Sequence, residues 1–309
     1  MEQRIYDMII IGGGPGGYTA ALYAARAGMD TLLIEKLSAG GQMCLTDQID
    51  NYPGFDEGVD GYTLGFKMQA GAERFGAKTL LAEVLSLTLD APVKTVETSD
   101  GTYQARTVVL ATGANPRPLG VEHEQERVGR GIHYCAACDG MFFRGKTVAV
   151  VGGGNTAAAD ALLLARLCEK VILIHRRDTL RATKLYHESL MQTPNVEFRW
   201  NSAVDSLHFD DESFRGVTLK DLQTGERSEL AVDGVFVAVG RIPNVELVRG
   251  QLDLDESGYI IADESTRTNL PGVFAVGDVR TKALRQVITA ASDGAVAAFY
   301  AEEYLAAGE

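Results

Sequence analysis

The run Met8-Ile9-Ile10-Ile11-Gly12-Gly13-Gly14-Pro15-Gly16-Gly17 decides the fold of this 309-residue chain. Its apolar half predicts a buried strand, and its glycines, followed by an Ala-rich stretch, predict a tight turn that opens a helix. Glycines in the pattern G-x-G-x-x-G let the backbone approach a pyrophosphate, and the helix N-terminus presents free N–H groups to that anion. The stretch therefore predicts a β-α-β unit that binds a dinucleotide.

A second copy of the pattern lies near the middle of the chain. It follows the apolar run Thr147–Val151 and reads Gly152-Gly153-Gly154-Asn155-Thr156-Ala157, with Ala in place of the last glycine. One such pattern is a weak signal, because a Gly-rich turn without a ligand is the alternative. Two copies, each with a strand before it and a helix after it, predict an α/β protein with two Rossmann-like nucleotide-binding domains.

The strands that follow the two copies end in different side chains. The position 23 residues beyond the first glycine of each copy is Glu35 in one case and His175 in the other, followed by Arg176 and Arg177. A carboxylate accepts hydrogen bonds from a ribose 2′-OH, whereas arginines accommodate a 2′-phosphate. We expect FAD or NAD in the first half and NADPH in the second, with Arg181 as a third positive charge. A solvated basic face is the alternative for the arginines.

A dithiol motif, Cys135-Ala136-Ala137-Cys138-Asp139-Gly140, lies between the two glycine patterns. Four cysteines in a chain of this length do not form a disulfide framework, and in a reducing cytosol C-x-x-C predicts a redox-active pair. A zinc site is the alternative, but it needs further ligands, and Cys44 and Cys168 lack the required spacing. We therefore expect no metal, a packing role for Cys44, and a buried helical position for Cys168.

Composition and charge agree with a cytoplasmic enzyme. The hydrophobic content of 46% is sufficient for two cores, and the formal net charge of −13 argues against binding to nucleic acid. The sequence contains no apolar run of membrane-spanning length and no signal-peptide pattern at its start. We expect a protein that binds neither nucleic acid nor membranes.

Two proline-containing segments, Asn115–Pro118 and Arg241–Asn244, are predicted to be linkers. Each follows a strand with an equivalent ending, Ala111-Thr112-Gly113 in one half and Ala238-Val239-Gly240 in the other, so the chain is internally duplicated. Residues after the second linker are too few for a third nucleotide domain and must complete the first. They include a predicted strand that ends in Gly277-Asp278, where the carboxylate can bind a sugar-alcohol chain or simply cap a turn.

Together these motifs resemble the low-molecular-weight thioredoxin reductases of bacteria, over essentially the whole chain. The resemblance implies an FAD domain of residues 1–116 and 245–309, interrupted by an NADPH domain of residues 117–244 that carries the dithiol, each with a three-layer ββα arrangement. It also implies FAD and NADPH as cofactors, thioredoxin as the protein substrate, and a homodimer. The pair Ala159-Asp160 departs from the paired acids that the family often has.

The resemblance further implies a set of contact residues. The FAD contacts would be Gly12, Gly14, Pro15, Gly17, Glu35, Gly41, Gln42, Asn51, Ala111, Thr112, Gly113, Gly277, Asp278, Arg285, Gln286 and Val287. The NADPH contacts would be Gly152, Gly154, Asn155, Thr156, His175, Arg176, Arg177 and Arg181.

The expected reaction passes electrons from NADPH through FAD to the Cys135–Cys138 disulfide and then to a partner disulfide. By resemblance, Cys138 lies nearer the flavin, and Asp139 is a general-acid candidate whose alternative role is that of a turn residue. Because nicotinamide and dithiol share one domain, we hypothesise that this domain rotates about the linkers between half-reactions. A flavin-dependent dithiol oxidase, a reductase serving a peroxidase, and a non-enzymatic redox sensor are the rival interpretations.

Overall fold

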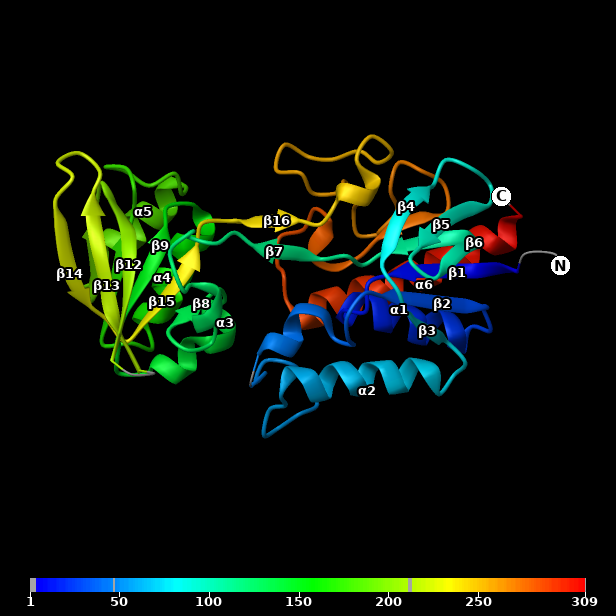
Figure 1. Ribbon diagram of the computed structural model, residues 1–309, viewed down its shortest axis with the longest axis horizontal. Helices are drawn as coiled ribbons and strands as arrows, with labels where there is room; N and C mark the ends of the chain where they lie inside the picture. Colours follow the sequence, from blue (N-terminus) through cyan, green and yellow to red (C-terminus); the bar gives the residue numbers. More distant parts are fainter. Residues whose placement is uncertain (1–3, 47, 211–212, 309) are drawn as a thin grey trace. The chain divides into compact units, whose positions relative to one another are not determined.

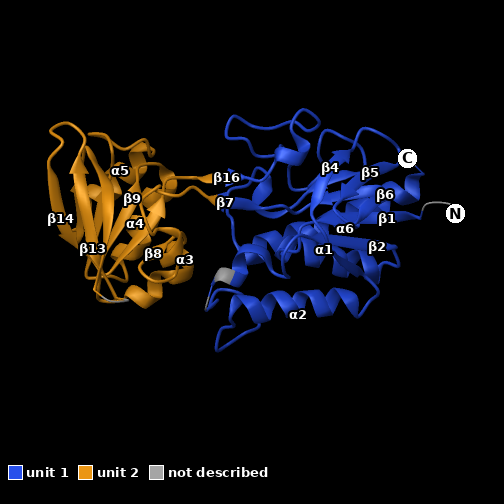
Figure 2. Ribbon diagram, viewed as in Figure 1, with its two compact units in different colours: residues 1–115, 242–309 blue, residues 116–241 orange. Residues whose placement is uncertain are grey.

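Two β-sheets, one mixed and one parallel and each with its own helices, form the core of the chain (Figure 1). The computed structural model describes residues 4–46, 48–210 and 213–308. These divide into unit 1, residues 1–115 and 242–309, and unit 2, residues 116–241, which is inserted into unit 1 along the chain (Figure 2). The predicted α/β class with two nucleotide-binding folds is confirmed.

Unit 1 contains a seven-stranded sheet of order β3-β2-β1-β6-β5-β4, with β17 also pairing with β6. The pairs among β1, β2, β3, β6 and β17 are parallel, whereas β4 and β5 form an antiparallel meander with β6. The strands are β1 (Ile5–Ile11), β2 (Thr31–Glu35), β3 (Lys78–Leu81), β4 (Val84–Thr88), β5 (Lys94–Thr98), β6 (Gly101–Leu110) and β17 (Val273–Ala275).

Side-chain alternation along β1 separates the two cores of unit 1. Met8 and Ile10 pack with the helices on one face, and Ile9 and Ile11 pack on the other face with β4, β5 and residues 245–279. Successive side chains of a strand point to opposite faces, so a continuous apolar run is buried on both sides. The result is three layers, two of β structure and one of helices.

The helical layer of unit 1 is built from α1, α2 and α6. Helix α1 starts with proline at its first position, where the missing N–H leaves no bond unmade. Helix α6 starts with a capping box, in which the side chains of Gln286 and Thr289 bond each other's backbone, and ends at Gly308 in the left-handed region. The helices are α1 (Pro15–Arg26), α2 (Gly61–Glu73) and α6 (Val287–Ala307), with short 3-10 turns at η1 (Gly41–Leu45), η4 (Glu246–Val248) and η5 (Gly277–Val279).

Unit 2 repeats this plan with a five-stranded parallel sheet of order β11-β10-β9-β15-β8. Val148 and Val150 of β9 face the core of helix α4, and Ala149 and Val151 face the antiparallel sheet β12-β13-β14. The strands are β8 (Ile132–His133), β9 (Thr147–Gly152), β10 (Lys170–Ile174), β11 (Val196–Arg199), β12 (Ser202–Asp210), β13 (Ser213–Asp221), β14 (Arg227–Ala231) and β15 (Gly234–Ala238). The helices are η2 (Gln125–Arg127), α3 (Ala136–Asp139), η3 (Gly140–Phe143), α4 (Asn155–Ala165) and α5 (Lys184–Gln192).

The two predicted linkers pair with each other as a two-stranded sheet of β7 (Ala114–Pro116) and β16 (Arg241–Pro243). The division between the units falls within these strands, after residues 115 and 241, whereas the sequence placed it after residues 116 and 244. Proline N atoms cannot donate, but the neighbouring backbone continues the pairing: Asn244 N donates to Gly113 O (3.0 Å) and Arg117 N to Gly240 O (2.9 Å).

One local expectation needs correction. Cys168 is buried as predicted, at 6% exposure, but it does not lie in a helix, because α4 ends at Ala165 and the chain turns before β10. Among the helices in the described ranges, none is both long and apolar enough to cross a membrane.

Candidate functional site

The first glycine loop connects β1 to α1 in unit 1. Gly12 has φ +105°, and a Cβ there would collide with the backbone of Ala111; a Cβ on Gly17 would collide with the carbonyl oxygen of Gly12. Both collisions explain why only glycine fits. Gly14, by contrast, borders open space and directly precedes α1, whose first turn has no side-chain cap. The loop therefore leaves the N-terminal amides of α1 available to an anion.

Glu35 and the η1 loop border this glycine loop. The Glu35 carboxylate accepts hydrogen bonds from Gly13 N (2.6 Å) and Leu37 N (3.0 Å), which fixes it beside the loop. A methyl group added to Gly41 would lie 3.3 Å from Cα of Gly14, so η1 also approaches closely. Strand β2, the glycine loop and η1 thus bring their predicted site residues together.

Gln42 is held by hydrogen bonds to strand β7, and Thr112 is held by hydrogen bonds to Asn244, which follows β16. The Gln42 side chain donates to Ala114 O (2.6 Å) and to Asn115 Oδ1 (2.7 Å). Asn244 donates to Thr112 O (2.8 Å), and the Thr112 hydroxyl donates to Asn244 O (2.7 Å). The sequence did not identify Asn244 as a support, because no local pattern connects it with Thr112.

The Gly277-Asp278 turn is anchored by a buried ion cluster. Asp293 of α6 accepts hydrogen bonds from Gly277 N (2.8 Å), from two nitrogens of Arg280 (2.9 and 2.8 Å) and from Lys282 Nζ (2.7 Å). Burial alone raises the pKa of Asp293, but the bonds from Arg280 and Lys282 outweigh it and hold that pKa below its usual value. The sequence gave no sign of this cluster, which fixes the turn to α6.

Four further predicted contact residues surround the start of α6. Asn51 donates to the side-chain oxygen of Gln286 (2.9 Å), which joins the 50s loop to this helix start. The Arg285 guanidinium lies 4.1 Å from the centroid of the Tyr259 ring, and Val287 begins the helix. A Cβ on Gly16 would lie 3.0 Å from Val276, so the start of α1 and the Gly277 turn are neighbours.

The second glycine loop, in unit 2, has the same construction. A Cβ on Gly152 would meet the backbone of Ala238 and the side chain of Ala157, whereas Gly154 borders open space before the uncapped start of α4. Asn155 accepts a hydrogen bond from Thr183 N (2.9 Å), which ties the segment after the arginines to this helix start. Thr156 follows in the first turn of α4 and is exposed.

The predicted basic residues gather beside this loop. His175 is buried against Gly153, and Arg181 N donates to Gly153 O (2.7 Å). Arg176, Arg177 and Arg181 are exposed, and no carboxylate within the described ranges forms an ion pair with any of them. Burial lowers the pKa of His175, and the neighbouring arginine charges lower it further. The arrangement favours a phosphate ligand, because the positive charges are uncompensated.

The dithiol lies between β8 and η3 of unit 2. Cys135 and Cys138 are joined in a disulfide, and Cys135 Sγ accepts a hydrogen bond from Cys138 N (3.2 Å) at the start of α3. Asp139 ends α3, and its Oδ2 lies 2.8 Å from His133 Nδ1. No group of three or more metal-ligating side chains occurs in the part of the chain that the structure describes.

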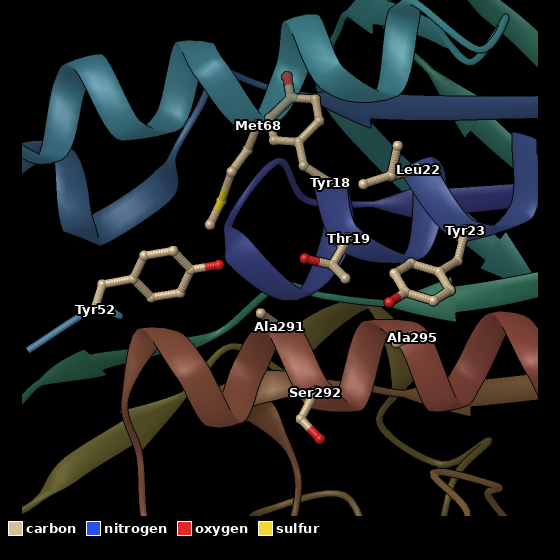
Figure 3. A pocket seen from close by; sticks show the side chains of 9 residues that line it. All are labelled: Tyr18, Thr19, Leu22, Tyr23, Tyr52, Met68, Ala291, Ser292 and Ala295. Atoms are coloured by element: carbon tan, nitrogen blue, oxygen red, sulfur yellow. The ribbon is translucent and has the colours of Figure 1, made fainter. Parts of the chain in front are cut away.

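A separate surface pocket of about 360 Å³ lies in unit 1 between α1, α2 and α6 (Figure 3). Its lining is mostly apolar and aromatic, and includes none of the predicted site residues. The lining residues are Tyr18, Thr19, Leu22, Tyr23, Tyr52, Met68, Ala291, Ser292 and Ala295.

Comparisons with known proteins agree with the motifs. A family model described as pyridine nucleotide-disulphide oxidoreductase matches residues 6–294. A thioredoxin reductase of Streptomyces clavuligerus is 47% identical over 306 residues, covering 98% of this chain and 95% of the relative. One from Listeria monocytogenes serovar 1/2a is 45% identical over 307 residues, covering 98% and 95%.

Solved structures give the same result. The crystal structure of thioredoxin reductase from Streptococcus pyogenes MGAS5005 matches with a TM-score of 0.91 and 42% identity, covering 98% of this chain and 99% of that chain. The resemblance expected from the motifs is thus confirmed. The chain belongs to the pyridine nucleotide-disulphide oxidoreductase family.

Proposed function

We propose that this chain is an NADPH-dependent flavoprotein that reduces the disulfide of thioredoxin through FAD and the Cys135–Cys138 pair. The observation that carries the proposal is the bonded cysteine pair in the unit whose glycine loop is flanked by uncompensated arginines. The match to thioredoxin reductases along nearly the full chain supports the choice of substrate.

FAD is assigned to unit 1. The fit is supported by the open space at Gly14, the uncapped start of α1 and the fixed carboxylate of Glu35. In this assignment, α1 amides bind the pyrophosphate, Glu35 binds ribose hydroxyls, and Asp278 binds the ribityl chain. When bound, the flavin accepts a hydride and returns two electrons to a disulfide.

NADPH is assigned to unit 2. Its pyrophosphate would bind at the start of α4, and its 2′-phosphate would bind Arg176, Arg177 and Arg181. Each charge-assisted bond contributes about 1.5–3 kcal/mol, so loss of one arginine weakens NADPH binding by about 10- to 100-fold. His175 stays neutral in this environment, since both burial and the arginine charges disfavour its protonation.

The cysteines carry the exchange with the partner. One thiolate of the reduced pair attacks a partner sulfur, the partner's S–S bond breaks, and the second cysteine then displaces the partner from the mixed disulfide. Two thiols of this chain become a disulfide, while the partner disulfide becomes two thiols, so protons and electrons balance. Asp139 transfers the proton to the leaving sulfur in this assignment.

Rotation of unit 2 completes the proposed cycle. The dithiol and the NADPH loop belong to the same unit, so they take turns at the flavin of the other unit. Strands β7 and β16 are the proposed pivot, because the chain passes between the units only in these two segments. A cross-link that fixes one orientation should stop turnover, and full activity of the cross-linked enzyme would exclude rotation.

The decisive experiment is stopped-flow reduction of the flavin with NADPH and with NADH, followed by addition of oxidised thioredoxin. We expect rapid reduction by NADPH, reoxidation by thioredoxin, and loss of the second step in Cys138→Ser. Cys168→Ala removes a buried cysteine that has no assigned role and serves as the matched control. Preference for NADH, or reoxidation by oxygen but not by thioredoxin, would contradict the proposal; the latter result is that of a dithiol oxidase. A redox sensor would bind both nucleotides and reduce no thioredoxin.

The proposed assembly is a cytoplasmic homodimer formed through α1 and α6. Tyr23 and Phe299 are 48% and 56% exposed, and they share a surface hollow with Arg26 and Glu302. A twofold interface places this hollow against the same hollow of the second copy, so Arg26 of one copy can pair with Glu302 of the other. Sedimentation should give a dimer for the native chain and a monomer for Phe299→Glu; a monomeric native chain would contradict this. The cytoplasm is proposed because its thiols are kept reduced.

A further inference from the structure

His133 is a buried histidine beside the dithiol that the proposed mechanism does not use. It ends strand β8, is 5% exposed, and places Nδ1 2.8 Å from Oδ2 of Asp139. Two aromatic rings enclose it: Phe143 edge-on at 4.9 Å between centroids and Phe236 tilted at 5.3 Å. Phe143 and Phe236 also meet edge to face at 5.3 Å, so the three rings form one cluster.

The aromatic cluster fixes the direction of the imidazole. A ring packed between two other rings has little rotational freedom, and its Nδ1 therefore points along one direction. That direction leads to Asp139, which ends the four-residue helix α3 and follows Cys138 in the chain. The Asp139 side chain is 20% exposed, so its carboxylate is largely withdrawn from water. The position of this carboxylate is consequently set by His133 as well as by its own backbone.

A purely structural role does not account for the choice of histidine. A phenylalanine fills the same space between Phe143 and Phe236 without a polar atom to satisfy. Burial of an imidazole is unfavourable unless its nitrogens find partners, and here a partner is the residue next to the redox-active sulfur. An imidazole in contact with a carboxylate also shares a proton with it, which an apolar ring cannot do.

We propose that His133 is a positioning residue of the dithiol site, which orients Asp139 and shares with it the proton that Asp139 exchanges with the cysteine sulfurs. The inference rests on the proposed function, because it assigns to Asp139 the proton transfer of that reaction. His133 itself touches neither sulfur nor partner and acts through Asp139.

The step balances as follows. Opening of the Cys135–Cys138 bond breaks one S–S bond and forms two S–H bonds, which takes two electrons and two protons. A hydride from the nicotinamide donor supplies both electrons and one proton, and water supplies the other. Asp139 hands a proton to a sulfur, His133 restores it to Asp139, and solvent reprotonates His133. In the reverse direction the same pair takes up the proton that a thiol releases.

The described groups that pack around the pair are mostly aromatic or apolar. Helix α3 contributes Asp139, and β15 contributes the ring of Phe236. The ammonium of Lys146 lies over the ring of Phe143, 5.3 Å from the ring centroid. Leu164 of α4 and Leu167, in the turn after that helix, place methyl groups next to Gly140 at the end of α3. The polar contact between Asp139 and His133 is therefore set in largely apolar surroundings.

The first test needs neither flavin nor partner. The dithiol is opened with a chemical reductant, and alkylation of Cys138 is followed by peptide mass spectrometry as a function of pH. His133→Phe retains the ring but removes the proton, and His133→Asn retains a donor that does not titrate. His208→Phe is the matched control, since His208 is another histidine of unit 2 that bonds only Thr218 (2.6 Å) among the described contacts.

We expect the alkylation midpoint of His133→Phe to rise by about one pH unit, which makes alkylation near neutral pH about tenfold slower. The reason is that His133→Phe removes the hydrogen-bond partner that places the Asp139 carboxylate, so this carboxylate takes up the proton of the thiol less readily. His133→Asn, which cannot share a proton with Asp139, should show the same rise, and His208→Phe should match the native chain. A native profile in His133→Phe would overturn the proposal.

The second test is a double-mutant cycle on thioredoxin reduction. We expect about tenfold or greater loss of turnover in His133→Phe and no further loss when this change is added to Asp139→Asn, because both act through one proton path. Multiplying losses would overturn the proposal. If the native chain reduces no thioredoxin, the proposed function fails, and the alkylation profile still decides the role of His133.

Discussion

Asp293→Ala should destabilise unit 1 far more than removal of an ordinary surface carboxylate. The side chain is 5% exposed and compensates the charges of Arg280 and Lys282, which are themselves almost fully buried. Breaking a buried ion pair by removing one partner costs about 3–5 kcal/mol, because the remaining charges are left unpaired in a poorly hydrated place. For a unit of this size that loss lowers the unfolding temperature by about 6–20 °C.

The effect has a defined pH dependence. The hydrogen bonds from Arg280 and Lys282 hold the pKa of Asp293 below its usual value. A carboxyl group of this kind stabilises the fold above its unfolded pKa of about 3.9 and loses that contribution as the pH falls through the lower folded pKa. The difference between native chain and variant should therefore stay constant from about pH 5 to pH 8 and shrink only under more acidic conditions.

Thermal unfolding followed by circular dichroism, together with FAD affinity from flavin fluorescence, measures the outcome. Glu303→Ala is the matched control in the same unit, since Glu303 pairs with Arg267 at 3.6 Å with both side chains about half exposed; it should cost about 1 kcal/mol or less. Asp293→Leu combined with Arg280→Met should recover stability relative to Asp293→Ala, because fewer buried charges remain. Equal stability of Asp293→Ala and Glu303→Ala would refute the reasoning.

Three further outcomes follow from the sites. Replacement of Arg176 and Arg177 by Gln should lower kcat/KM for NADPH by about 100-fold or more and leave that for NADH unchanged, as steady-state assays will measure; equal losses would contradict a 2′-phosphate site. Gly17→Val should abolish flavin binding, measured by visible absorbance, because its side chain would collide with Gly12. Burial raises the pKa of Asp160 to about 6, so the native chain loses stability as the pH rises from about 4 to about 6. Asp160→Asn should accordingly raise the unfolding temperature near neutral pH and leave it unchanged in acid. An unfolding temperature equal to that of the native chain at neutral pH as well as in acid would refute this.

The glycine loops and the dithiol could be predicted from the sequence because their requirements are local. A tight turn, an open helix start and a close backbone contact each demand a small residue at a fixed offset, so the spacing itself carries the information. Gly12 and Gly152 meet the backbone of the neighbouring strand's end in the same way, at Ala111 and Ala238. The α/β class and the disulfide between Cys135 and Cys138 follow from equally local patterns.

The supports of these sites could not be predicted, because each one joins residues that no pattern connects. Asp293 lies in the first half of α6, in a stretch of small residues that gave no reason to expect a buried carboxylate. His133 precedes the dithiol by two residues and was not identified, since its significance lies in the direction of one ring nitrogen. Cys168 is a further example. Its apolar neighbours in the sequence predicted that it is buried, but they could not predict that α4 ends before it, because the end of a helix depends on tertiary packing.

The insertion of unit 2 explains why contacts around strands β7 and β16 could not be predicted from the sequence. Thr112 and Asn244 bond each other in both directions although 132 positions separate them, and Asn115 bonds Asn244 across 129. Contacts over such separations need the chain to return after the whole of unit 2, and they lie where β7 pairs with β16. A sequence pattern reports what a segment does within one or two elements, so it identifies the two proline-containing segments as linkers and not as paired strands. The amide contacts at this point are therefore a product of the duplicated, interrupted topology, and only the folded chain reveals that Gln42 is bound to the same strand ends.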